Sequence, residues 1–325
     1  MSVFKSAGSD LEAVGDVPLG RLIAHYAEQN PDWPMLTVAE RTFSRAEVER
    51  RSNRLARALA ERGVVPGDFV TIALPNSIAH YETTYAVWKL GATPSIVSWR
   101  LPDNELRPII RLVNPKLVVG CDASRVPGYP VLPADFEAEA TLSSDPLPER
   151  VPKYWKAMTS GGSTGRPKVI VDHMPGLWNP QLSVANLPFG ETVLNTGPLY
   201  HNAPFILMHF ALFMGNHVVD LVKFDALRTL QLVETHRVSW LYLVPTMMHR
   251  IWRLPEAQRS AFDLSSLKTV IHMGAPCPIW LKEKWIEWLG PDRIYEGYGG
   301  TERQASTEIT AVSYTHLTLP TNREV

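Results

Sequence analysis

Short apolar runs alternate with segments of helical periodicity between residues 69 and 120. The apolar runs, rich in β-branched residues, cover residues 69–74, 94–98 and 116–120. Residues 77–90 and 102–113 lie between them and repeat apolar side chains at helical spacing. Because parallel strands need helical connections, the pattern predicts an α/β fold with helices packed on a predominantly parallel sheet.

A further helix is predicted upstream, where Ser44 and Glu47 form a capping-box pattern. Apolar residues follow at helical spacing, and Gly63 stands where it can end the helix. The apolar positions are Val48, Leu55 and Leu59. We expect this helix to pack that face on a sheet.

A second alternating region begins after residue 153. Its predicted strands cover residues 154–158, 168–172, 193–196, 217–221, 238–244, 268–273 and 293–296. Residues 225–236 repeat leucine and valine at helical spacing, which predicts a helix between two of these strands. This region therefore continues the α/β pattern.

A proline-rich segment separates the two regions, with prolines at 127, 130, 133, 146, 148 and 152. We divide the chain into a first α/β subdomain (1–121), a proline-rich crossing segment (122–153) and a second α/β subdomain (154–311). Residues 312–325 differ in character and are interpreted as a non-native tail, with a genuine terminal strand as the alternative.

Composition excludes several classes of function. The chain has 32 Lys and Arg against 33 Asp and Glu, and this balance gives no default nucleic-acid partner. Only Cys121 and Cys277 occur, which argues against a disulfide scaffold or a cysteine metal site. The apolar stretch at 204–219 is too short and too interrupted to cross a membrane. A cytoplasmic protein is expected, and self-association into a homo-oligomer is left open.

The segment 158–169 concentrates the chemistry. It holds three glycines, four hydroxyl residues and two cations, one of which is Lys168. Glycine lets a backbone approach a ligand closely, hydroxyls and amides donate to anionic oxygens, and the cation supplies charge. These are the properties of a polyphosphate-binding loop, although a plain flexible turn would also explain the glycines.

Two other motifs compete for the same residues. A Walker loop fails because Pro167 precedes Lys168 and no Ser or Thr follows it. The residues around Ser163 do match the G-x-S-x-G nucleophile elbow of α/β-hydrolases. The elbow needs a helix directly after the serine, whereas residues 168–171 have the pattern of a strand. An α/β-hydrolase using Ser163 is kept as the alternative.

Two more motifs occur downstream: Pro-Leu-Tyr-His-Asn at 198–202 and Tyr-Glu-Gly-Tyr-Gly-Gly-Thr-Glu at 295–302. Together with the loop at 158–169 they resemble, in order and spacing, the motifs of the adenylate-forming superfamily, which includes acyl-CoA synthetases. The resemblance spans roughly residues 19–311. It implies the fold of the large N-terminal domain of these enzymes, an AMP-forming acid:CoA ligase activity, and ATP, Mg²⁺ and CoA as cofactor or co-substrates.

The resemblance also implies residue roles. Lys168, Thr301 and Glu302 would act on the phosphates, with Thr301 donating to the α-phosphate and Glu302 holding Mg²⁺. Tyr298 offers a flat face for adenine between two glycines. The nucleotide would further contact Thr159, Ser160, Gly161, Gly162, Ser163, Thr164, Gly165, Gly274, Ala275, Pro276, Glu296, Gly297 and Gly299.

His201 is placed by the resemblance beside the acyl carboxylate, as a catalytic and substrate-contacting residue. Taken without its motif, a histidine between Tyr200 and Asn202 would more often be a structural residue at the surface or in the core. Ala203, Phe205, Leu207 and Gly300 would line the acyl site, although core packing explains the apolar ones almost as well. We expect the substrate to be a medium to large apolar carboxylic acid, such as a fatty acid or bile acid.

Two departures from the family pattern stand out. Val169 replaces the glycine usual after the loop lysine. The Asp motif, hinge and lid domain of the family are not recognisable after Ala311, so we expect this chain to be truncated and impaired in thioester formation. A non-catalytic nucleotide-binding fragment is therefore a further alternative.

Overall fold

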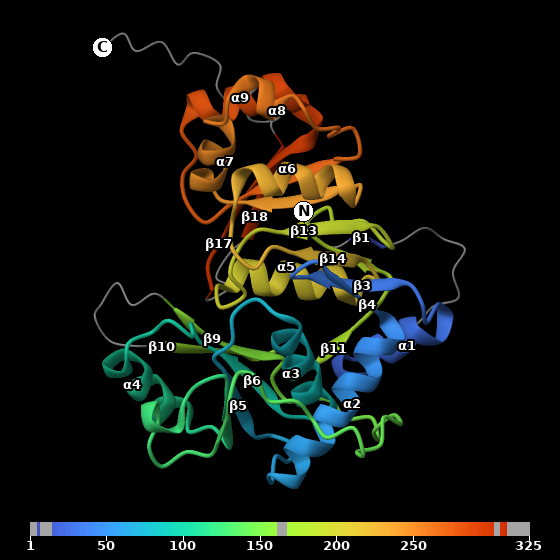
Figure 1. Ribbon diagram of the computed structural model, residues 1–325, viewed down its shortest axis with the longest axis vertical. Coiled ribbons are helices and arrows are strands. Elements are labelled where there is room, and N and C mark those ends of the chain that lie inside the picture. Colours follow the sequence, from blue (N-terminus) through green and yellow to red (C-terminus); the bar gives the residue numbers. More distant parts are fainter. Residues whose placement is uncertain (1–4, 7–14, 161–167, 302–305, 311–325) are drawn as a thin grey trace.

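The computed structural model contains two β-sheets with helices between them and on their outer faces (Figure 1). It describes residues 5–6, 15–160, 168–301 and 306–310. The α/β architecture with parallel-rich sheets expected from the sequence is confirmed. The non-native tail proposed at 312–325 lies outside the described residues.

The first sheet has six strands in the order β10-β9-β6-β5-β7-β8. Only the β9–β10 pair is antiparallel. The strands are β5 (Phe69–Ile72), β6 (Thr93–Ile96), β7 (Leu117–Val119), β8 (Val131–Leu132), β9 (Lys156–Ser160) and β10 (Lys168–Asp172).

The second sheet has eight strands in the order β18-β17-β16-β15-β13-β14-β3-β4. Its inner pairs are parallel, and β18 and β4 add antiparallel edges. The strands are β3 (Pro34–Val38), β4 (Arg41–Ser44), β13 (Thr192–Asn195), β14 (His217–Asp220), β15 (Trp240–Leu243), β16 (Thr269–His272), β17 (Ile294–Gly299) and β18 (Ser306–Thr310). Two short ribbons pair β1 (Lys5–Ser6) with β12 (Leu182–Ser183) and β2 (Val17–Pro18) with β11 (Leu177–Trp178).

The helices form separate layers. α3 (Ile78–Lys89) and α5 (Asn202–Phe213) pack between the sheets, where side chains of both sheets and both helices form the largest core. α4 (Asp103–Val113) covers the other face of the six-stranded sheet. The outer face of the eight-stranded sheet carries α6 (Ala226–Thr235), α7 (Pro245–Trp252), α8 (Glu256–Arg259) and α9 (Ile279–Leu289) (Figure 1). No helix in the described part of the chain is long and apolar enough to span a membrane.

Each of the two large sheets contains strands from both sides of the proline-rich segment. The division of the chain at residues 122–153 therefore does not coincide with a division between the sheets. β9 and β10 follow that segment, yet they extend the sheet of β5–β7. β3 and β4 precede it, yet they complete the sheet of β13–β17. Strand pairing over such separations depends on tertiary contacts, which a local sequence pattern does not report.

α2 (Arg45–Glu61) begins and ends where the sequence indicates. The Ser44 hydroxyl accepts a hydrogen bond from the Glu47 backbone N–H at 3.3 Å, and Gly63 follows the helix with a φ of +82°. The expected packing on a sheet is wrong for most of its length. α2 lies mainly against α3 and α1 (Leu22–Gln29), and contacts β3 and β4 less extensively.

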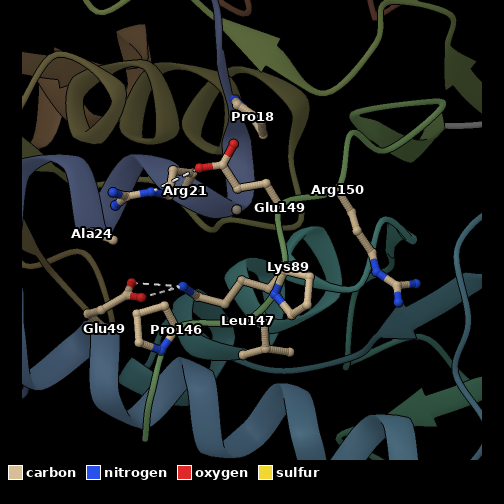
Figure 2. Close-up of a pocket in the computed structure, with 11 residues that line it drawn as sticks. Pro18, Arg21, Ala24, Glu49, Lys89, Pro146, Leu147, Glu149 and Arg150 are labelled. Carbon is tan, nitrogen blue, oxygen red and sulfur yellow. Dashed lines mark hydrogen bonds and ion pairs between the residues drawn. The ribbon is translucent and has the colours of Figure 1, made fainter.

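A buried ion pair joins α2 to α3 beside the proline-rich segment (Figure 2). Lys89 Nζ donates to both carboxylate oxygens of Glu49, at 2.7 and 2.8 Å, and both side chains are almost fully buried. Glu49 also accepts from Asn53 Nδ2 at 3.0 Å. A cavity of about 20 Å³, the size of one water molecule, lies beside the pair.

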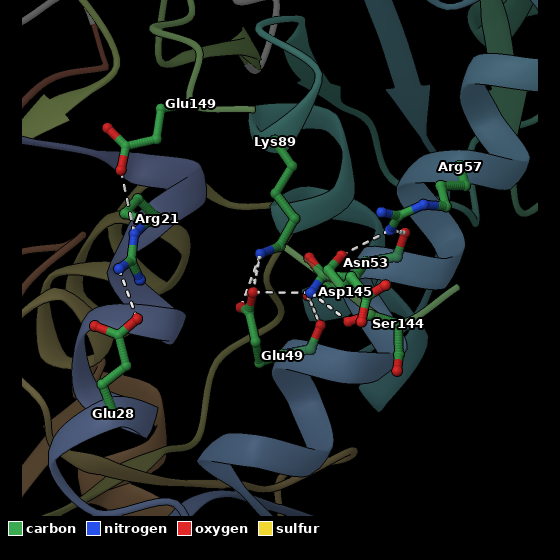
Figure 3. A network of polar contacts seen from close by, with 10 residues as sticks. Arg21, Glu28, Glu49, Asn53, Arg57, Lys89, Ser144, Asp145 and Glu149 are labelled. Carbon is green, nitrogen blue, oxygen red and sulfur yellow. Dashed lines mark hydrogen bonds and ion pairs between the residues drawn. The ribbon is translucent and has the colours of Figure 1, made fainter. Parts of the chain in front are cut away.

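Three side chains of α2 hold the proline-rich segment by donating hydrogen bonds to its backbone carbonyl groups. Asn53, Arg54 and Arg57 donate to the carbonyl oxygens of residues 144, 142 and 145, at 2.9, 3.2 and 2.8 Å. Figure 3 shows the contacts of Asn53 and Arg57 together with the Arg21 guanidinium, which pairs with Glu28 and with Glu149. Residues 142–150 of this segment, called the strap below, therefore lie against α2 and are held there by these contacts.

Between the sheets, α3 and α5 bury two histidines. His80 and His209 have no exposed surface, and each ring packs against Phe205, at 6.2 and 4.1 Å between centroids. Nearby, the buried Asp220 carboxylate at the end of β14 accepts from Tyr81 and from Asn76, the latter at 2.7 Å. These polar groups tie the helix layer to the carboxyl ends of the parallel strands.

Candidate functional site

A cavity of about 320 Å³ opens between α5 and the end of β17. Six residues of the predicted nucleotide and acyl sites line it: Ala203, Leu207, Gly297, Tyr298, Gly299 and Gly300. The other lining residues are Trp155, Val184, Ala185, Asn202, Ile206, Phe210, Ile271, Met273, Thr307 and Glu308. Motif residues separated by nearly a hundred positions thus share one cavity.

α5 forms one wall of this cavity. Ala203, Ile206, Leu207 and Phe210 face the space because an α-helix repeats every 3.6 residues. Phe205 corrects the sequence expectation, since it is fully buried on another face of α5, against His80 and His209. Core packing, the alternative explanation for this residue in the sequence, is what the structure shows.

The opposite side carries the Tyr298 motif. β17 extends to Gly299, three residues beyond the predicted end, because β18 pairs with it there. The Tyr298 side chain is 73% exposed, and its neighbours on either side are glycines. A methyl group at Gly297 would overlap the end of the Met273 side chain, so glycine lets Met273 lie close to the β17 backbone.

The predicted adenine-side loop, Gly274 to Pro276, follows β16 and is exposed. β16 and β17 are parallel and adjacent, with His272 opposite Glu296, so this loop lies at the same sheet edge as Gly297–Gly300. It does not line the cavity described above. A ligand that contacted both would have to extend along that edge.

The β9–β10 hairpin carries the ends of the predicted phosphate loop. Ser160 pairs with Lys168, and Thr159 with Val169. Lys168 is exposed, and Thr159 is half-buried. Gly161, Gly162, Ser163, Thr164 and Gly165 lie outside the described residues. The hairpin brings Thr159, Ser160 and Lys168 together at the ends of two paired strands. The two ends of the predicted phosphate loop therefore lie next to each other.

The start of β9 faces the end of β17. Trp155, directly before β9, lines the same cavity as Tyr298 and Gly300. Thr301 follows β17 and is half-buried, and Glu302 lies outside the described residues. Whether the loop at 161–167 faces Glu302 across a cleft stays a prediction.

Glu296 lies one strand position before Gly297 and accepts a hydrogen bond from Lys282 of α9, whose side chain is almost completely buried. The pair sits beside His272, a fully buried histidine whose pKa burial lowers to about 4. Glu296 is thus held in a structural ion pair next to the predicted nucleotide site and does not line the cavity.

His201 is the residue before α5, and its side chain is exposed. Surrounding protein still excludes enough water to lower the pKa of its imidazole below the usual 6.5. The ring is therefore neutral at neutral pH and carries one donor and one acceptor nitrogen. It lies next to Asn202, which lines the cavity, whereas His201 itself is outside the lining.

Several lining residues were missed from the sequence. Ile206 and Phe210 could have been found from their helical spacing with Ala203. Trp155, Met273 and Thr307 could not, because only the tertiary fold brings their strands to this cavity. Trp155 packs its ring parallel to Phe210, with 5.7 Å between centroids, and so closes the apolar part of the cavity.

The structure bears on two other chemistries. A nucleophile elbow at Ser163 needs a helix directly after the loop, whereas from Lys168 the chain is a strand, β10. Among the residues that the structure describes, no three His, Cys, Asp or Glu side chains gather as a metal site. A metal held by one carboxylate and by ligand phosphates needs no such cluster.

Comparison with known proteins gives the family. Residues 23–323 match the family described as AMP-binding enzyme. Feruloyl-CoA synthase of Amycolatopsis sp is 33% identical over 271 residues, which are 79% of this chain and 54% of that protein. The 4-coumarate--CoA ligase-like 2 of Arabidopsis thaliana is 29% identical over 82% of this chain and 53% of its own length. The chain spans about half the length of these curated relatives.

Solved structures support the fold. The N-terminal domain of FACL13 from Mycobacterium tuberculosis superposes with a TM-score of 0.81 at 20% identity, covering 93% of this chain and 80% of that one. The o-succinylbenzoate CoA synthetase of Bacillus subtilis gives 0.78 at 18%, over 94% of this chain and 63% of its own. The resemblance inferred from the three motifs is confirmed: the chain belongs to the AMP-binding enzyme family and has the fold of the N-terminal domain of adenylate-forming enzymes.

Proposed function

We propose that this chain binds ATP and a carboxylic acid and forms an acyl-adenylate, whose acyl group is then transferred to the thiol of CoA with release of AMP. One observation carries the proposal: an apolar cavity of about 320 Å³ ends at the exposed ring of Tyr298 and the glycines beside it. An acid in the cavity would present its carboxylate next to a nucleotide that stacks on Tyr298. Two reactants held in this way need little further positioning to react.

The residues supply positioning and charge. Lys168, Ser160 and Thr159 at the hairpin would contact the phosphates, and Thr301 would donate to the α-phosphate. Mg²⁺, held by Glu302 and phosphate oxygens, would neutralise charge on the triphosphate when bound. His201, neutral in this structure, would donate to the acyl carboxylate. The acid's carboxylate then attacks the α-phosphorus, and pyrophosphate leaves.

The acid is proposed to be apolar and of medium to large size. Most of the lining is aliphatic or aromatic, and Trp155 and Phe210 stack where an acyl chain or ring would end. The names of the relatives, feruloyl-CoA synthase and 4-coumarate--CoA ligase-like 2, favour an acid that carries a ring. A cavity of this volume holds a ring-bearing or medium-chain acid.

Acid-dependent exchange of labelled pyrophosphate into ATP tests the proposal. We expect exchange that requires Mg²⁺ and an apolar acid, and that falls about 10²–10³-fold in Lys168→Met, because one charge contact is lost in the transition state. Tyr298→Ala should weaken ATP binding and leave the fold intact, since the ring is exposed. ATP that fails to bind the unaltered chain in calorimetry would contradict the proposal.

A further inference from the structure

Lys156 is a completely buried lysine beside the cavity. It is the first residue of β9, and its side chain has no exposed surface. Its Nζ lies 3.6 Å from Asp172 Oδ2 on the paired strand β10 and 5.0 Å from the centre of the Trp155 ring. A buried ammonium is stable only with such compensating partners.

The same ammonium reaches α5. Lys156 Nζ donates to Asn202 Oδ1 at 2.9 Å. Because an ammonium can only donate, the oxygen and not the nitrogen of the Asn202 amide must face it. The contact therefore fixes the orientation of the Asn202 amide, with its oxygen toward Lys156 and its nitrogen away from it.

Asn202 also borders the cavity. Asn202 is half-buried and lines the 320 Å³ space at the start of α5, one residue after His201. Among the described residues, none accepts a hydrogen bond from Asn202 Nδ2, and the polar side chains that share the lining, Thr307 and Glu308, come from the opposite strand β18. The amide thus adds an oriented donor to an otherwise mostly apolar wall.

We propose that Asn202 is a substrate-contacting residue whose Nδ2 donates to an oxygen of the acid's carboxylate, and that Lys156 is the positioning residue that holds it in this orientation. This inference rests on the proposed function. The donor lies at the end of the wall near His201, where the reacting carboxylate must lie, and the deeper positions of α5, Leu207 and Phe210, are apolar. An apolar acid would be held at its carboxylate by Asn202 and along its body by α5.

Asn202→Asp separates this role from a structural one. The substitution preserves size and keeps an oxygen facing Lys156, so the fold and the contact with α5 remain. It replaces the donor at the cavity by an anion, which repels a carboxylate. Asn104→Asp, on the exposed face of α4, makes the same change of charge away from the cavity and is the matched control.

Calorimetry with two acids and their neutral amides is the test: trans-cinnamate against trans-cinnamamide, and octanoate against octanamide. We expect Asn202→Asp to weaken binding of at least one acid about tenfold or more and to change that acid's amide by less than threefold, since charge-assisted hydrogen bonds are the strong ones. Asn104→Asp should leave every probe unchanged. Lys156→Met combined with Asp172→Asn should reproduce a smaller loss for the acid.

The other outcomes overturn the inference in distinguishable ways. Equal affinity of the unaltered chain and Asn202→Asp for the acids shows that Asn202 does not contact the carboxylate and leaves the proposed function intact. Equal losses for acid and amide show that Asn202 shapes the cavity only. An unaltered chain that binds ATP and none of the four probes overturns the acid site, and one that binds no ATP overturns the proposed function itself.

Discussion

Single residues on α5 divide into those that line the cavity and those that hold the helix in the core. Leu207 and Phe210 contact the open space, whereas Phe205, two residues before Leu207, packs against His80 and His209. Substitution at adjacent positions should therefore have different kinds of effect. This contrast gives a test that needs no knowledge of the natural acid.

Leu207→Ala should change which acid the enzyme prefers and leave ATP affinity unchanged, because it enlarges the cavity away from Tyr298. Each methylene of pocket volume is worth about 1–3 kcal/mol of discrimination, so longer or bulkier acids should gain relative to shorter ones. Phe205→Ala should instead lower the free energy of unfolding by about 3–5 kcal/mol. Acid competition assays and urea titrations separate the two, and an unchanged acid profile in Leu207→Ala would place this side chain outside the acyl site.

At the scale of elements, α2 and α3 are joined by a polar contact inside an apolar layer. Lys89 and Glu49 are nearly buried, and burial lowers the pKa of Lys89 while the Glu49 carboxylate opposes that shift. The strap at 142–150 covers the pair and is tied to the same helix by Asn53 and Arg57 (Figure 3). The strap therefore helps to exclude water from the ion pair between Lys89 and Glu49.

Lys89→Met should lower the free energy of unfolding by about 3–5 kcal/mol, because it leaves the Glu49 carboxylate buried without its cation. Lys284→Met removes an exposed pair with Glu287 on α9 and should change stability by less than about 1 kcal/mol. Lys89→Met with Glu49→Leu should recover much of the loss. Urea titrations of the three variants check this, and equal midpoints for Lys89→Met and Lys284→Met would contradict a desolvated pair.

The pattern of elements was largely predictable from the sequence, because strands and helices report their own periodicity. α3 and α4 begin at Ile78 and Asp103, close to the expected starts, and most strands agree within two residues. The order of strands within each sheet was not predictable, since β3 and β14 pair directly although they are far apart in the sequence. The site followed the same division: the Tyr298 motif lines the cavity, whereas Trp155 and the Lys156–Asn202 contact depend on strand β9 lying beside α5.

For the whole molecule, buried titratable groups make the free energy of unfolding depend on pH. Burial lowers the pKa of His80 to about 3 and the pKa values of His209 and His217 to about 4. Burial also raises the pKa of Asp220 to about 6. In the unfolded chain these histidines take up protons below about pH 6.5, whereas in the folded chain they do not. Their contribution to the free energy of unfolding is therefore complete above that pH and is lost as the pH falls. His272, whose pKa burial also lowers to about 4, acts in the same sense as these three histidines. Asp220 acts in the opposite sense, but it is one group against four.

Stability should therefore fall by about 5–7 kcal/mol between pH 7.5 and pH 5, the net of four histidines and one carboxyl at up to about 1.4 kcal/mol per pH unit each. Urea titrations at the two pH values measure the change. His80→Leu removes one of the linked groups and should reduce the difference by up to about 2 kcal/mol. A difference that is the same in His80→Leu as in the unaltered chain would show that His80 is not neutral and buried as the structure has it.

The order of strands in the eight-stranded sheet also determines when this sheet can form during synthesis of the chain. The β3–β4 hairpin leaves the ribosome early, but one edge of β3 has no partner until β14 has been synthesised, some 180 residues later. Until then the nascent chain exposes an apolar strand edge of the kind that pairs with other chains. A nascent chain stalled before His217 should therefore bind chaperones more strongly than one stalled after α6, because only the longer chain contains the second partner of β3.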